Sequence, residues 1–140
     1  MVFAEGANFR FVVEGGIVKF RLWRREDLDS AQGAKLAEET VAEFENVSRL
    51  PEDEASVLIM DIREGPIVCG PMTQVAVGRM LAAWGRTHRP LAVLCSDAPI
   101  QSLQYRRLVS QHVSRGSVFV SEVELQAWLR KRGAMLEEGR

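Results

Sequence analysis

The 140-residue sequence lacks the patterns that mark the commonest enzyme and metal sites. It shows no group of ligands at metal-binding spacing, no glycine-rich phosphate loop and no recognisable catalytic triad. The cysteines, Cys69 and Cys95, have neither the CxxC spacing of zinc and redox sites nor the density of a disulfide-stabilised secreted protein. We therefore expect no metal, no cofactor and a reducing, cytoplasmic location.

Long apolar runs and an excess of one charge are also missing. No apolar run approaches the ~18 residues of a membrane span, and residues 1–10 lack the features of a secretory signal, so we expect neither a span nor processing. The chain has 18 Lys and Arg against 19 Asp and Glu, and its basic pairs are scattered, which argues against nucleic-acid binding. A composition of 46% hydrophobic residues predicts one domain over 1–140, and we expect a flexible tail at 133–140.

The periodicity of the apolar residues predicts an α/β protein. Alternation on both sides of Gly15-Gly16 indicates a β-hairpin over about 9–22, and helical spacing from Ser30 to about Phe44, capped by Asp29 or Ser30, indicates a first helix. Further patterns predict strands at 57–62, 91–95 and 117–120 and helices at about 72–87, 100–114 and from 121 onward. Right-handed crossovers then give a mostly parallel mixed sheet with helices packed on it, in the order ββαβαβαβα.

A functional surface is expected where the strand Val57–Ile62 ends, because ligands and partners of such sheets bind at the carboxyl ends of the strands. Asp61 stands at that end, and a loop punctuated by glycine and proline follows it. Trp23 leaves the sheet between cationic residues, as an interface anchor would. The predicted partner- or ligand-binding residues are Arg63, Glu64, Cys69, Gly70, Thr73 and Trp23.

Two segments carry a resemblance to a known family. Val57-Leu-Ile-Met-Asp-Ile62 in the central strand and Val118-Phe-Val-Ser-Glu-Val-Glu-Leu-Gln-Ala-Trp-Leu129 at the end, together with the order of elements, resemble the STAS superfamily over about residues 9–131. The similarity is to its stand-alone bacterial members, related to anti-sigma-factor antagonists. It implies a non-catalytic module that binds a regulatory protein in signalling.

The loop of residues 63–73 departs from the family pattern. Regulated antagonists carry an Asp-Ser-Ser-Gly-like turn at which a partner kinase phosphorylates a serine, and this loop contains no serine. Thr73 is the nearest phosphate acceptor, where a helix N-terminus favours negative charge, although its position is not the family's.

Two other functions stay open. Met72, Val75 and Met80 could face a cavity that holds a small apolar ligand or a lipid, since methionine suits adaptable pockets. Cys69 could act as a thiol nucleophile with His88 or His112 as its base. The partner in the leading hypothesis is a protein of unknown identity, and a homodimer is a further possibility.

Overall fold

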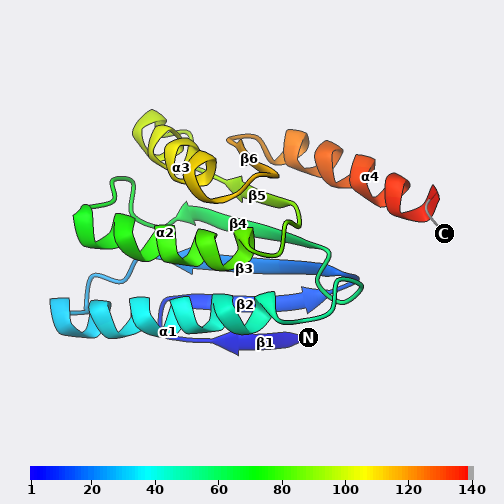
Figure 1. Ribbon diagram of the computed structural model, residues 1–140. Helices are drawn as coiled ribbons and strands as arrows, with labels where there is room; N and C mark the ends of the chain where they lie inside the picture. The colour runs from blue at the N-terminus through cyan, green and yellow to red at the C-terminus, as the bar shows by residue number, and fades with distance from the viewer. Residues whose placement is uncertain (139–140) are drawn as a thin grey trace.

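The computed structural model describes the backbone of residues 1–138 and the side chains of residues 1–132. It contains a six-stranded mixed sheet and four helices, in the order β1 (Val2–Glu5), β2 (Phe9–Glu14), β3 (Ile17–Trp23), α1 (Ser30–Ser48), β4 (Val57–Glu64), α2 (Pro71–Gly85), β5 (Leu91–Leu94), α3 (Pro99–His112), β6 (Gly116–Phe119) and α4 (Glu122–Glu138). The α/β class and the mixed, mostly parallel sheet are confirmed (Figure 1).

The predicted order ββαβαβαβα is wrong by one strand at the N-terminus. Residues 2–5 form β1, which pairs antiparallel with β2, so the order is βββαβαβαβα. This strand has four residues, all of them exposed or half-buried, and therefore shows no buried apolar face in the sequence. Gly6 donates its backbone N–H to the carbonyl of Phe9 at 2.9 Å in the turn that returns the chain.

The hairpin of β2 and β3 is confirmed, and its turn explains the two consecutive glycines. Gly15 and Gly16 have φ values of 57° and 79°, the left-handed region that a two-residue hairpin turn requires. The register pairs Phe11 with Phe20, and both rings are buried. With Phe9 and Phe44 of α1 they form a cluster of edge-on and tilted aromatic contacts that fixes α1 on the sheet.

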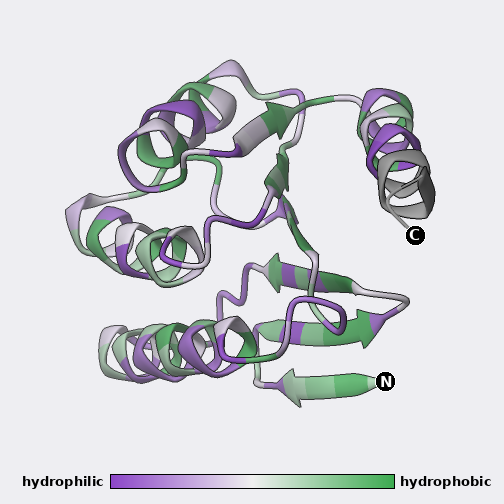
Figure 2. Ribbon diagram, turned by 45° about the vertical axis from the view of Figure 1, so that its right-hand side comes forward, coloured by the Kyte–Doolittle hydropathy of each residue, from purple (hydrophilic) through white to green (hydrophobic). Residues whose placement is uncertain are grey.

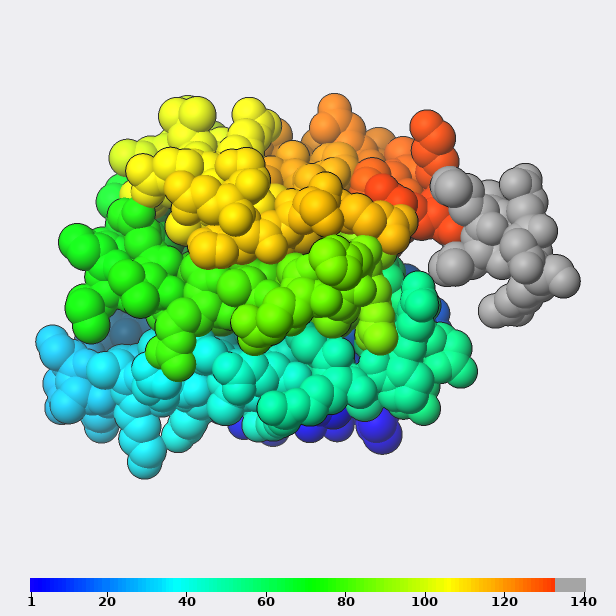
Figure 3. Space-filling model, viewed as in Figure 1, coloured from blue at the N-terminus to red at the C-terminus, as the bar shows by residue number. Residues whose placement is uncertain are grey.

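Strands β3 to β6 are parallel and neighbour one another in chain order. Because each right-handed crossover steps to the next strand in the same direction, the crossover helices α1, α2 and α3 lie on one face. Figure 3 shows them as a continuous layer of side chains over the sheet. The main core lies beneath this layer and includes Met60, Leu81, Trp84 and Tyr105.

Helix α4 packs on the opposite face, which Figure 2 shows most clearly. A second, smaller core forms there from Ile59, Ala92, Leu94 and Leu125, with Phe119 and Trp128 against it. Arg10, Lys19 and Arg21 are exposed and alternate with the buried side chains of β2 and β3. The backbone of α4 continues to Glu138, so the predicted flexibility of residues 133–140 stays a prediction, and residues 139–140 lie outside the described part of the chain.

Candidate functional site

The carboxyl ends of β3 to β6 lie along one edge of the sheet, here called the C-terminal edge. All six residues predicted from the sequence lie at this edge, but in two groups. Trp23, Arg63 and Glu64 end β3 and β4 and connect to side chains of the α4 face. Cys69 and Gly70 precede α2, and Thr73 lies in its first turn.

The first group is a chain of paired charges. Arg63 holds Asp61 with two side-chain hydrogen bonds, of 3.0 and 2.8 Å, and reaches Glu122 of α4 at 3.3 Å. Glu64 accepts a hydrogen bond from Arg21 at 2.7 Å. The guanidinium of Arg21 also lies 5.3 Å from the ring centroid of Trp23, which is half-buried.

These pairings set the protonation of Asp61. Burial alone would raise its pKa, but the side-chain and backbone hydrogen bonds from Arg63 and the charges of Arg63 and Arg21 lower the pKa below its ordinary value. The hydrogen bond with Asp61 raises the pKa of Arg63. Asp61 is therefore held as a carboxylate in an ion pair with Arg63.

The second group is held by glutamine side chains. Gln104 of α3 accepts a hydrogen bond from the backbone N–H of Cys69 at 2.8 Å, and Gln74 and Gln104 both donate to the Cys69 carbonyl. Gln101 is fully buried and donates to the carbonyls of Ile62 and Pro66 at 3.0 and 3.2 Å. The loop between β4 and α2 is thus fixed to α3 by hydrogen bonds that satisfy its backbone.

The thiol of Cys69 lies in an interior environment. Its side chain is 3% exposed, and burial raises the pKa of the thiol although a hydrogen bond with Tyr105 acts in the opposite direction. Burial likewise raises the pKa of Cys95 to about 12. A nucleophilic cysteine needs the opposite shift, because the thiolate is the reactive form.

Neither histidine accompanies Cys69. Cys69 precedes α2 and His88 follows it, and a helix of 15 residues separates them by about 22 Å. The ring of His112 lies against Gly78, and along α3 it is two turns, about 10 Å, beyond the Tyr105 that contacts Cys69. The structure does not bring together the residues of the thiol hypothesis.

Gly70 and Thr73 are exposed at the start of α2. Gly70 is the N-cap in an extended conformation, and neither it nor Ala98, the N-cap of α3, provides a side-chain cap. Pro71 and Pro99 occupy the first turn of their helices, as proline prefers. Phosphorylation of Thr73 stays a prediction.

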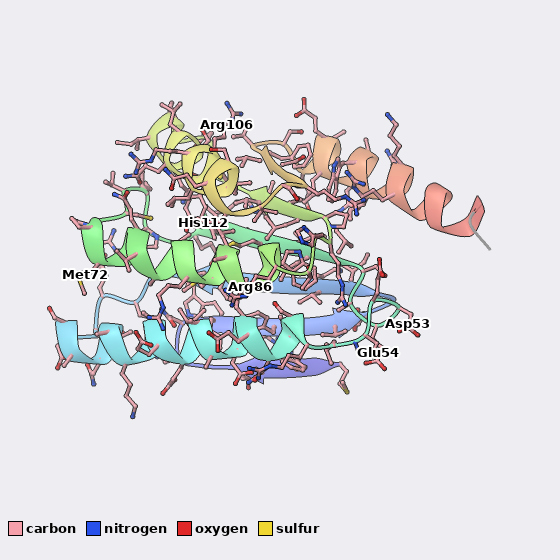
Figure 4. All side chains as sticks on the ribbon, in the orientation of Figure 1. Asp53, Glu54, Met72, Arg86, Arg106 and His112 are labelled. Atoms are coloured by element: carbon pink, nitrogen blue, oxygen red, sulfur yellow. The ribbon has the colours of Figure 1, made fainter. Side chains whose placement is uncertain are left out.

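The three residues proposed to line an apolar cavity point in different directions. Met72 and Val75 are 81% and 61% exposed, whereas Met80 is 4% exposed and belongs to the main core. Figure 4 shows Met72 at the N-terminal end of α2. These side chains therefore do not share one pocket.

Sequence reasoning missed a cluster of exposed apolar side chains at the same edge. We call it the apolar rim: Ile67 and Val68 of the loop, Met72 and Val75 of α2, and Ile100 and Leu103 of α3, with exposed fractions of 46% to 81%. The loop and the start of α3 are neighbours because Gln101 and Gln104 of α3 form hydrogen bonds with the loop backbone. The signal in the sequence is that these residues fall outside the buried stripe of each helix.

Comparison with protein-family models, curated proteins and solved structures finds no match. Within the described part of the chain, no three or more His, Cys, Asp or Glu residues are grouped so that they could hold a metal ion. None of the helices described is both long enough and apolar enough to cross a membrane.

Proposed function

We propose that this chain is a non-catalytic interaction module of STAS-like type that binds a partner protein through the apolar rim. The observation that carries the proposal is the gathering of six large apolar side chains, each at least 46% exposed, on one loop and two helix starts. Large apolar side chains left exposed at one edge of a domain are candidates for an interaction site.

The support underneath the rim also favours binding. Loops that bind partners are most useful when a rigid scaffold presents them in one conformation. Here the loop is held by Gln74, Gln101 and Gln104, and Pro71 and Pro99 restrict the backbone where both helices begin. The rim is therefore presented with little conformational entropy to lose on association.

Charged groups beside the rim supply a polar border, which interfaces commonly have. Arg106 and Arg107 are exposed on α3, one turn beyond the rim residue Leu103. The STAS-like assignment rests on the resemblance of two segments and on the alternation of parallel strands and helices. The loop lacks the family's serine, so the proposed contact needs no phosphoserine switch.

The test is capture of proteins from a lysate of the source cell by three forms of the chain. The wild type and Val2→Lys, a control at an exposed apolar residue of β1, should retain the same partner, and Val68→Lys/Met72→Lys should lose it. Because all three positions are exposed, each variant should unfold within about 0.5 kcal/mol of the wild type. A partner retained by the double variant contradicts the proposal.

Light scattering on the purified forms separates the two kinds of partner. A wild-type dimer that the double variant converts to a monomer would make the occupant of the rim a second copy of this chain. A monomer in all three forms, with capture lost only in the double variant, favours a different protein.

A further inference from the structure

A cavity of about 310 Å³ lies at the other end of the sheet, where the parallel strands begin. Its walls come from the hairpin turn, from the first residues of β3 and β4, from the residues that precede β5 and β6, and from the last described side chains of α4. This N-terminal edge is separate from the apolar rim, and nothing in the proposed function uses it.

Most of the wall is apolar. Val57 and Pro90 are buried, and Ile17 and Leu129 are half-buried residues that also bound the smaller core. The volume equals the space of roughly ten water molecules in the liquid, so a molecule of roughly ten non-hydrogen atoms would fill it. Ligand pockets combine such a wall with a few converging polar groups.

Two arginines supply those groups. Arg132 is half-buried, its guanidinium lies 4.4 Å from the ring centroid of Trp128, and its buried Nε has no hydrogen-bond partner. Arg115 comes from the loop before β6 and donates from Nη1 to the carbonyl of His88 at 3.3 Å. Both line the cavity, from different elements.

The two positive charges have no carboxylate partner within the part of the chain whose side chains are described. Neither arginine forms an ion pair with a carboxylate of residues 1–132. Both guanidinium groups line the same cavity, and burial, and then the charge of Arg115, lower the pKa of Arg132. Arginine stays protonated even so, and a bound anion would relieve both desolvation and repulsion.

We propose that this cavity binds a small monocarboxylate with an apolar chain, the carboxylate between Arg115 and Arg132 and the chain against Val57, Pro90 and Leu129. Arginine forks match the geometry of a carboxylate. Glu52 also lines the cavity, so two arginines and one glutamate leave a net charge of +1, which one negative charge balances. Free phosphate leaves the apolar wall unfilled and brings excess charge.

The test is calorimetric titration of the full chain with three probes. Octanoate has both required parts, octanol has the chain without the charge, and inorganic phosphate has charge without the chain. We expect saturable binding of octanoate, at least ten-fold weaker binding of octanol, and weaker binding of phosphate than of octanoate. This arm uses only the wild type, so it does not depend on any variant folding.

Variants then locate the site. Arg115→Gln and Arg132→Gln should each weaken octanoate binding at least ten-fold, and Leu129→Trp should block it by filling the cavity. Arg130→Gln, which removes an exposed charge of α4 that does not line the cavity, should bind within two-fold of the wild type. Glu52→Gln should strengthen binding several-fold because it removes the opposing charge.

Three results would overturn the proposal. They are equal affinity for octanol and octanoate, phosphate binding as tight as octanoate binding, and equal loss in Arg130→Gln and Arg132→Gln. The proposed function would survive all three, since the apolar rim is tested by partner capture. Conversely, a capture experiment that contradicts the proposed function would not change the result of the octanoate titration.

Discussion

The two ends of the parallel sheet are closed by different means. At the C-terminal edge, side-chain hydrogen bonds and ion pairs hold the loops, and apolar side chains face outward. At the N-terminal edge, backbone atoms of neighbouring elements lie in close contact, and the side chains of Arg115 and Arg132 line a cavity. Figure 4 marks the two ends by Met72 at one and by Asp53 and Glu54 at the other.

The comparison indicates which changes each end tolerates. Surface side chains of the C-terminal edge can be exchanged without disturbing the core, so this edge is free to vary with its partner. Closely packed backbone at the N-terminal edge leaves no such freedom, since packed interiors transmit even small changes of volume. A cavity in that setting is a fixed shape, which suits a small ligand better than a protein.

Gly85, at the end of α2, tests the packing of the N-terminal edge and should give the largest effect. A methyl group on Gly85 would lie 2.0 Å from the backbone oxygen of His112, so α2 and α3 would have to separate. We expect Gly85→Ala to lower the free energy of unfolding by about 3 kcal/mol or more, measured by urea denaturation.

Gly33→Ala is the matched control. Gly33 lies within α1, and no atom lies within 4 Å of the position of an added methyl group. Alanine there should stabilise the protein by about 0.5–1 kcal/mol, because glycine is the poorer helix former. Equal effects of the two substitutions would show that the helix ends are not in close contact.

Gln101 tests the hydrogen bonds of the C-terminal edge. Gln101→Leu would leave the carbonyls of Ile62 and Pro66 and the N–H of Ser96 without the partner that they have in the structure. We expect a loss of about 2–3 kcal/mol in the free energy of unfolding. Gln126→Leu, at an exposed residue of α4, should change it by less than about 0.5 kcal/mol.

The effect of Gln101→Leu should reach the rim as well. Amide hydrogen exchange in the loop of residues 63–70 should become faster than in the wild type, because the loop loses two of its attachments to α3. Unchanged exchange together with lost stability would mean that Gln101 fills space in the core without holding the loop.

Much of the fold was predictable from local patterns. The glycine pair at the hairpin, the cap at Asp29 and the buried strand at Val57 each follow from interactions within a few residues of the chain. The capping box of Asp29 with Gln32 is present in the structure. Strand β1 was missed because it forms by pairing with β2, and its own four residues show no pattern of buried apolar side chains.

The candidate site was predictable only as an edge of the sheet. The rule for parallel sheets placed Arg63, Glu64 and Cys69 at the carboxyl ends of the strands, where the structure has them. The buried state of Cys69 depends on α3, which lies far along the chain. The apolar rim could not be predicted from the sequence, because it consists of the apolar residues that stay exposed once the core has packed. Likewise, Arg115 and Arg132 line one cavity only because α4 packs on the sheet next to the strand that follows Arg115.

The ion pair of Asp61 should give the smallest effect and has a pH signature. Because Arg63 lowers the pKa of Asp61 in the folded state, the pair stabilises the protein above the unfolded pKa of about 3.9 and loses its effect as the pH falls through the folded value. The side chains of Asp61 and Arg63 are 26% and 43% exposed, so solvent screening limits the contribution at pH 7 to about 1 kcal/mol.

Asp61→Asn should therefore be less stable than the wild type at pH 7 and equally stable near pH 2. Asp97→Asn, at an exposed residue without an ion pair among the described side chains, should show no such convergence. A pH-independent difference for Asp61→Asn would instead assign the effect to packing and make the two ends of the sheet alike.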